Sequence, residues 1–293
     1  MAMNPWLEVA LNGPWTRSYQ PRIPVTVDEI VEEAVACVEE GAAIVHVHAY
    51  DAETGRQKDD PDLYARIIEG IRARVDAIVY PTVPFASRSQ GPGASRLEDR
   101  FAAIEELGRR GLLEWSVVDL GSLNFVRRDE LQEGEGGFIH TNSLPEIRAN
   151  LDLAVRFGFH PSYTVYEAGF LRLGAALKRL TGGLPQPVYR LMFSDAYTFG
   201  FSPTPRALDT YLGLLDELDP GAPWMVAGLG VSIDPLLAVA AERGGHIRVG
   251  LEDVPPQAER SNLELVREAA ALMARHGHGL ADAAAVRRSL AGG

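Results

Sequence analysis

Short apolar runs alternate along this chain with longer amphipathic segments. The runs are rich in β-branched and aromatic residues, a composition that favours β-strands. They occupy residues 7–13, 42–49, 77–83, 115–122, 160–167, 187–194, 223–230 and 246–253. Strands separated by helices usually pair in parallel, and about eight of them close a (β/α)8 barrel, the TIM barrel. The alternative architecture is an open doubly wound sheet.

The segments between the runs carry helix signals. Thr26 precedes an acid three positions later, Glu29, and Ser261 stands in the same relation to Glu264, which is the capping-box pattern. The predicted helices cover residues 26–40, 61–74, 95–109, 143–157, 169–181, 204–218, 234–243 and 261–276. A last amphipathic piece, 281–290, is expected to pack outside the barrel or against another subunit.

The long loops of the predicted barrel follow its strands. No linker rich in Ser or Pro divides the chain, so residues 1–293 are predicted to form one barrel domain with a C-terminal helical extension. The longest irregular segments are 84–94, 124–142 and 195–203. Loops that follow strands lie at the C-terminal face of a barrel, where active sites are built. Functional residues are therefore expected there.

Composition and charge narrow the class of protein. Of the 293 residues, 46% are hydrophobic and 23% charged, with a net charge of −12. This acidic balance argues against a general role at nucleic acids or membrane surfaces. The sequence shows neither a signal peptide nor an apolar run near the ~20 residues of a membrane span. Cys37 is the only cysteine, which excludes an intramolecular disulfide and leads us to expect a cytoplasmic protein.

Two of the seven histidines lie inside one apolar run, in the stretch "AAIVHVHAY". On a strand, alternate side chains share a face, so His46 and His48 point side by side into the same space near the strand's C-terminal end. Buried imidazoles need partners for their ring nitrogens. The pattern alone leaves a metal site and a structural histidine pair equally open.

The run at 246–253 is apolar on one face and charged on the other. Arg248, Gly250 and Glu252 share the inward face, and burying such charges is expensive unless each is paired or bound to something. An Arg248–Glu252 ion pair is one explanation. The other is that Glu252 approaches the two histidines, because strand eight of a barrel closes against strand one, which neighbours strand two. Two imidazoles, one carboxylate and an open position make a catalytic metal site, for which zinc is the first choice and iron(II) or manganese the reserve.

Other polar residues are weaker candidates. Asp253 follows Glu252 and is a candidate general base, or else a turn or capping residue. His160 and His246 open their strands and are expected at the opposite, structural face, and His140 lies in a loop that reaches the site at most weakly. An amidohydrolase also needs histidines at the tops of later strands, and the sequence offers none there.

Several motifs together resemble the β-keto acid cleavage enzymes, the family of the 3-keto-5-aminohexanoate cleavage enzyme. The resemblance runs in order over nearly the whole chain through "IPVTVDEI", "EEGAAIVHVHAYDAETGR", "GSLNF", "VYEAG", "WMVAGLG" and "GGHIRVGLED". It implies a TIM barrel that tends to form tetramers, and a divalent metal, usually zinc, on His46, His48 and Glu252. It also implies that the Arg248–Asp253 pair takes part in catalysis.

The resemblance implies a reaction as well. A β-keto acid and acetyl-CoA, the co-substrate, are converted to acetoacetate and a new acyl-CoA through a metal-stabilised enolate and a retro-Claisen cleavage. Asp253 would remove the proton while Arg248 holds its geometry and charge. Two other functions stay open: a CoA-independent metal-dependent aldolase or lyase acting on a β-dicarbonyl compound, and a non-catalytic barrel that binds metal and ligand.

The chain departs from the family at positions that would touch the substrate. Trp15 stands where the cleavage enzyme of lysine fermentation has a glutamate for the substrate ammonium, so the substrate is expected to lack that amino group and to present an apolar or aromatic tail. Thr82 and Pro84 replace a Ser-Thr-Gly-Gly run, and only Thr82 carries over directly. Val117 and Asp119 replace a threonine and an asparagine, and Asp119 is expected to take over part of the substrate contact. The loop 194–202 lacks the family's usual Gly-Gly run, which weakens the inference that CoA docks there.

Overall fold

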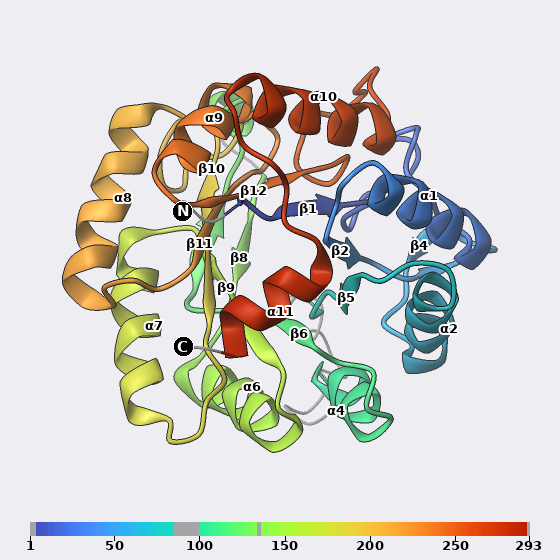
Figure 1. Cartoon of the computed structure of the whole chain (residues 1–293), viewed down its shortest axis with the longest axis horizontal. Coiled ribbons are helices and arrows are strands. Elements are labelled where there is room, and N and C mark those ends of the chain that lie inside the picture. The colour runs from blue at the N-terminus through green and yellow to red at the C-terminus, as the bar shows by residue number, and fades with distance from the viewer. Residues whose placement is uncertain (1–3, 85–99, 134–135, 292–293) are drawn as a thin grey trace.

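The chain folds into a barrel of eight parallel strands surrounded by helices, in a computed structural model that describes residues 4–84, 100–133 and 136–291 (Figure 1). The sheet order is β5-β2-β1-β12-β11-β10-β9-β6, and the edge strands β5 and β6 lie next to each other, so the barrel is nearly closed. Its strands are β1 (Leu7–Ala10), β2 (Ile44–Val47), β5 (Ile78–Pro81), β6 (Trp115–Asp119), β9 (His160–Val165), β10 (Val188–Phe193), β11 (Trp224–Gly228) and β12 (His246–Val249). The predicted TIM barrel is confirmed and the open sheet was wrong.

Most helices surround the barrel: α1 (Val27–Glu39), α2 (Pro61–Arg72), α4 (Ala102–Arg109), α6 (Leu144–Phe157), α7 (Ala168–Leu180), α8 (Pro205–Leu218), α9 (Asp234–Glu242), α10 (Asn262–Arg275) and α11 (Ala283–Ala291). The short α5 (Glu130–Glu133) instead lies between β7 and β8, beyond the C-terminal end of the barrel. Thr26 and Ser261 cap α1 and α10 in the predicted capping boxes. Of the helix predicted at 95–109, residues 95–99 lie outside the described residues.

The last helix, α11, packs outside the barrel near the starts of the strands. Its Val286 and Leu290 are buried. Arg287 donates hydrogen bonds to Asp76 (2.7 Å) and to the Ala77 carbonyl (3.4 Å), directly before β5. The helix therefore lies away from the C-terminal ends of the strands, and the first of the two predicted packing arrangements is confirmed.

The strands end earlier than the apolar runs do. The clearest case is β12, which stops at Val249 because Gly250 has a φ of +146°, a conformation that side chains rarely tolerate. A Cβ at this position would overlap the carbonyl oxygen of Ala10. The prediction that Glu252 continues the alternation of the strand was therefore wrong: the residue lies in the turn that follows.

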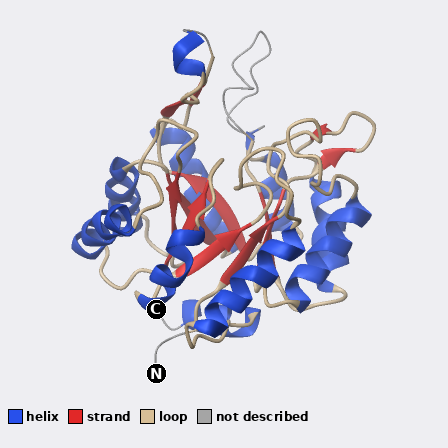
Figure 2. Cartoon of the chain, turned by 90° about the horizontal axis from the view of Figure 1, so that it is seen from above, coloured by secondary structure: helices blue, strands red, loops and turns tan. Residues whose placement is uncertain are grey.

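The C-terminal face carries two small hairpins that the apolar pattern did not predict. One pairs β3 (Tyr50–Asp51) with β4 (Arg56–Gln57), and the other pairs β7 (Leu123–Phe125) with β8 (Phe138–His140). Figure 2 shows both at the end of the barrel opposite the termini. The strands are two or three residues long, too short for a period to be visible. Within the part of the chain that the structure describes, no helix has the length and apolar character needed to cross a membrane.

Candidate active site

The two histidines of β2 point into the barrel together. His46 belongs to the strand and His48 follows it, and both are nearly completely buried, with exposed fractions of 1% and 3%. Asn12 fixes the backbone of His48 on both sides: its Oδ1 accepts from His48 N (2.9 Å) and its Nδ2 donates to His48 O (3.0 Å). The end of β2 is thus held by the loop after β1.

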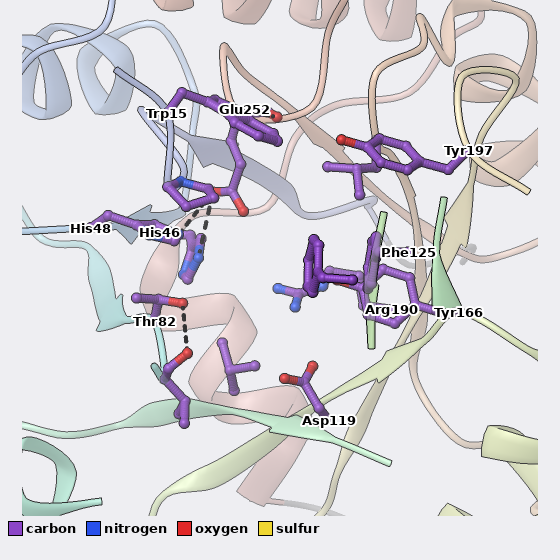
Figure 3. Close-up of a pocket in the computed structure, with 15 residues that line it drawn as sticks. Trp15, His46, His48, Thr82, Asp119, Phe125, Tyr166, Arg190, Tyr197 and Glu252 are labelled. Atoms are coloured by element: carbon purple, nitrogen blue, oxygen red, sulfur yellow. Dashed lines mark hydrogen bonds and ion pairs between the residues drawn. The ribbon is translucent and has the colours of Figure 1, made fainter. Parts of the chain in front are cut away.

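Glu252 completes a cluster of three metal-ligand side chains. Its Oε2 lies 3.5 Å from Nε2 of His46 and 3.6 Å from Nε2 of His48 (Figure 3). The potential ligand atoms all lie within 4.8 Å of one another. The carboxylate comes from the turn after β12 and the imidazoles from β2, so two segments that are about 200 residues apart in sequence meet only through closure of the barrel.

The chemical state of these atoms fits a divalent cation. His48 Nδ1 lies 3.1 Å from Oε1 of Gln57, and with the ring proton on Nδ1 the lone pair of Nε2 faces Glu252. Neither His48 Nε2 nor Glu252 Oε2 has a hydrogen-bond partner among the described residues. Burial lowers the pKa of His46 well below its usual value. Burial opposes ionisation of Glu252, but the positive charge of Arg248 holds its pKa well below the usual value. The cluster is a possible metal site made of two imidazoles and a carboxylate.

Arg248 lies behind this cluster and binds three carboxylates. Its Nε and Nη2 donate to the two oxygens of Asp253 (2.8 and 2.7 Å), and Nη2 is also 2.9 Å from Glu252. Nη1 donates to Glu8 at 3.1 Å. The Arg248–Glu252 ion pair therefore exists beside the possible metal site rather than in its place. Burial raises the pKa of Asp253 to about 6 against the opposing effect of Arg248.

Four buried polar residues of the barrel interior, Glu8, Tyr80, Thr164 and Arg190, were missed by the sequence reasoning. Tyr80 OH donates to Glu8 (2.7 Å) and accepts from Nη1 of Arg190 (3.0 Å), and Arg190 Nη2 donates to Thr164 (2.7 Å). With Arg248 they form one hydrogen-bonded network across the barrel. A signal was present, because Glu8 and Arg190 are charges inside the apolar runs "LEVA" and "VYRLMF".

A cavity of about 300 Å³ opens beside the metal-ligand cluster. Its polar lining residues include His46, His48, Thr82, Asp119, Arg190 and Glu252. Its aromatic lining residues are Trp15, Phe125, Phe138, Tyr166 and Tyr197. Figure 3 shows Phe125, Tyr166 and Tyr197 on the side opposite the two histidines. The possible metal ligands thus lie on one side of the cavity, and three aromatic side chains lie across from them together with Arg190.

The structure brings most of the predicted substrate residues to this cavity. Trp15 lies on its wall, where Nε1 donates to the backbone oxygen of Glu252 (2.9 Å), and Thr82 and Asp119 line it as well. Pro84 is not among the lining residues, and its carbonyl accepts from Nε of Arg100 at 2.9 Å. Asp253, 2% exposed, lies behind the cavity wall, held by Arg248.

Of the other histidines considered from the sequence, two lie at the starts of their strands as predicted, and His140 lies closer to the site than expected. His246 starts β12, accepts a hydrogen bond from Trp6 N (3.2 Å) and stacks on the Trp6 ring. His160 also starts its strand and contacts the Gln186 carbonyl (3.0 Å). His140 comes closer to the site than its loop position indicated, because it belongs to β8 and its Nε2 lies 3.2 Å from Asp119. Although burial opposes ionisation of Asp119, the hydrogen bond from His140 keeps the pKa of this carboxyl below its usual value.

Known proteins resemble this chain in sequence, and solved structures resemble it in fold. The 3-oxoadipate:acetyl-CoA acetyltransferase of Cupriavidus necator is 27% identical over 291 residues, covering 97% of this chain and 93% of that protein. The 3-dehydrocarnitine:acetyl-CoA trimethylamine transferase of Rhizobium meliloti is 26% identical over 292 residues, covering 94% and 92%. Among solved structures, apo ObcA aligns with a TM-score of 0.70 at 19% identity, over 92% of this chain and 66% of ObcA, and this shows similarity of fold.

The family comparison agrees with the site. The family model of the beta-keto acid cleavage enzyme matches residues 5–291, a range that includes both histidines, Arg248, Glu252 and Asp253. The resemblance drawn from the motifs is therefore confirmed. The chain belongs to the β-keto acid cleavage enzyme family and is an enzyme of that type.

Proposed function

We propose that this enzyme converts a β-keto acid and acetyl-CoA into acetoacetate and a new acyl-CoA. The observation that carries the proposal is the convergence of His46, His48 and Glu252 beside a cavity, with the Arg248–Asp253 pair directly behind them. Membership of the family supports the reaction type, and the names of two relatives include acetyl-CoA. Zinc is the metal we propose for the three ligands, because two imidazoles and one carboxylate are a frequent catalytic zinc set.

In the proposed reaction, the metal would activate the substrate, and Asp253 and Arg248 would handle the proton. A divalent cation on the three ligands would polarise the keto oxygen and lower the pKa of the neighbouring carbon acid. Asp253 would accept the proton from that carbon, since a pKa of about 6 leaves it ionised near pH 7 while keeping it a stronger base than an ordinary aspartate. Arg248 would orient Asp253 through its two parallel hydrogen bonds. Each Asp253 oxygen accepts one hydrogen bond from Arg248 and keeps a second lone pair that can take the proton.

The cavity favours a substrate with an apolar or aromatic tail. Its wall opposite the histidines is aromatic, and apolar tails gain free energy by leaving water for such a surface. Trp15 supplies an indole and no carboxylate, so we propose that the substrate lacks the amino group of 3-keto-5-aminohexanoate. Thr82 and Asp119 would contact its polar part. Pro84, which lies off the cavity wall, remains a predicted contact without structural support.

The test is acetoacetate release from a panel of β-keto acids. The zinc-loaded protein is mixed with acetyl-CoA and acids with apolar, aromatic, carboxylate or amino tails, with His46→Ala and Glu252→Gln as controls. We expect turnover that requires CoA, is fastest with an apolar or aromatic tail, and is absent in both controls. Turnover without CoA would favour an aldolase or lyase, and bound metal and ligand without turnover would favour a binding barrel.

We also infer a cytoplasmic homo-oligomer, a tetramer by analogy with the family. The single cysteine supports a reducing compartment. Apolar side chains exposed on and near the β7–β8 hairpin support an interface between subunits, and these are Leu131, Phe138, Ile139 and Leu144. Light scattering coupled to size-exclusion chromatography gives the mass directly, and a monomer at micromolar concentration would contradict the inference.

A further inference from the structure

Arg190 is a buried cation that has no anionic partner at hydrogen-bond distance among the described residues. It is 4% exposed, and its direct partners are two neutral hydroxyls, those of Tyr80 and Thr164. Its Nε has no hydrogen-bond partner among the described residues. The nearest carboxylate oxygen in the structure's ion pairs, Oε1 of Glu8, is 3.9 Å away. Burying a charge in this way is expensive unless something else compensates it.

The other arginine of the barrel interior makes the contrast clear. Arg248 contacts three carboxylates within 3.1 Å, and one of these is the same Glu8 oxygen that Tyr80 also uses. Oε1 of Glu8 thus accepts hydrogen bonds from both Arg248 and Tyr80, whereas its Oε2 has no hydrogen-bond partner among the described residues. Three carboxylates thus compensate the charge of Arg248, whereas Arg190 uses two of its five N–H donors in the hydrogen bonds to Tyr80 and Thr164.

The unused donors belong to a side chain of the cavity wall. Arg190 lines the cavity, and Figure 3 shows its guanidinium extending from the side of Tyr166 toward the middle of the site. Only one phenol separates it from the metal-ligand cluster: the Tyr80 hydroxyl accepts its hydrogen bond, and the Tyr80 ring lies 4.6 Å from the His46 ring. An anion held near the cluster therefore lies next to Arg190.

We infer that Arg190 binds the reacting carboxylate of the β-keto acid, the one next to the carbon that loses its proton. This inference rests on the proposed function and names the residue that recognises the charged end of the substrate. A carboxylate on the tail is a poorer fit, because the side of the cavity around Arg190 also carries the aromatic rings of Phe125 and Tyr166 and the anionic Asp119. The clamp by Tyr80 and Thr164 holds the guanidinium plane in place before substrate arrives, which favours paired N–H contacts to a carboxylate.

The experiment compares two probes that differ only in charge. Binding of a 3-oxo acid and of its primary amide is measured by calorimetry without acetyl-CoA, on the zinc-loaded native protein and on Arg190→Gln and Arg190→Lys. The amide keeps both oxygens that a metal would chelate and removes the negative charge. We expect Arg190→Gln to weaken acid binding by ~30-fold or more, as for loss of one partner of a buried charge pair, and amide binding by less than about threefold. Arg190→Lys should recover part of the acid binding, because lysine restores the positive charge but not the paired N–H donors of the guanidinium.

Equal weakening of acid and amide by Arg190→Gln would overturn the inference, because it would show a structural role. A native protein that binds acid and amide equally would overturn it even if the variant fails to fold. A third probe, a 3-oxo acid with a second carboxylate on its tail, tests the tail alternative: a loss confined to this probe also overturns the inference. Failure of the proposed reaction would appear differently, as no acetoacetate from native protein while the dependence of binding on Arg190 persists.

Discussion

Gly250 is the position where one added methyl group should disturb both the fold and the candidate metal site. Its φ of +146° is a conformation that other residues rarely adopt. A Cβ there would overlap the carbonyl oxygen of Ala10, and it would lie 2.7 Å from the Ala10 carbonyl carbon, whereas ordinary contact begins at 3.4 Å. The same Ala10 oxygen accepts a hydrogen bond from the backbone N of Glu252 (3.3 Å). Gly250→Ala therefore pushes apart the two segments that present Glu252 to the histidines.

The size of the effect follows from two contributions. The unfavourable backbone conformation costs about 1–3 kcal/mol. The overlap in a closely packed barrel costs about 1–3 kcal/mol more, because β1 and β12 must separate by roughly 1 Å before the Cβ and the Ala10 oxygen reach even a tight contact. We expect a loss of about 2–6 kcal/mol in the free energy of unfolding. Zinc affinity should fall as well, since Glu252 moves away from His46 and His48.

Gly244→Ala is the matched control. Gly244 ends the helix before β12 with a φ of +78°, and a Cβ there meets nothing within 4 Å. It should lose only the conformational contribution, about 1–2 kcal/mol, with unchanged zinc affinity. Urea unfolding and zinc calorimetry on both variants measure the two quantities. If Gly250→Ala is no less stable than Gly244→Ala and binds zinc equally well, the close approach of β1 and β12 does not position Glu252.

Three further predictions follow from the site and the core. Saturating zinc should raise the melting temperature of native protein by binding only the folded state, and should leave His46→Ala and Glu252→Gln unchanged; an equal rise in these variants would place the metal elsewhere. Burial lowers the pKa of His246 to about 3, below the ~6.5 of an unfolded histidine. The stability that neutral His246 contributes is therefore complete above pH 6.5 and is lost as the pH falls toward 3, by about 4–5 kcal/mol in total. In urea unfolding from pH 7 to 4.5, His246→Asn should lose less stability than the native protein, and an equal slope would be inconsistent with a buried neutral imidazole. Trp15→Glu should move the kcat/KM preference toward a 3-oxo-5-amino acid by at least ~10-fold, as expected when a carboxylate gains a cationic partner; an unchanged preference would show that this position does not contact the tail.

The candidate metal ligands could be predicted without coordinates because two simple rules apply to them. Alternation along β2 puts His46 and His48 on one face, and barrel closure brings the end of β12 near β2. The rule of alternation failed one step later, because Gly250 ends the strand and Glu252 reaches the histidines from a turn. The residue was identified correctly for a reason that was partly wrong.

Glu8 and Arg190 show the opposite case. Each is a single charged residue inside an apolar run. The apolar residues of the run are enough to predict the strand, but they do not indicate what the charged side chain does. Their meaning depends on neighbours more than 70 residues away, such as Tyr80 for Glu8. The hairpins β3–β4 and β7–β8 were not predicted for a related reason. Their strands depend on the surrounding loops for stability and are too short to show an alternation of apolar and polar residues.

By itself, the sequence determined the barrel, its helices and caps, and the family, because hydrophobic periodicity and local capping are properties of neighbouring residues. The tertiary structure alone decided which buried charges neutralise one another: Arg248 takes three carboxylates and Arg190 takes none within hydrogen-bond distance. It also decided that Pro84 lies off the cavity wall and that the wall opposite the histidines is aromatic. Electrostatic pairing and cavity shape depend on distances of a few ångströms between segments far apart in the chain, and no local pattern encodes such distances.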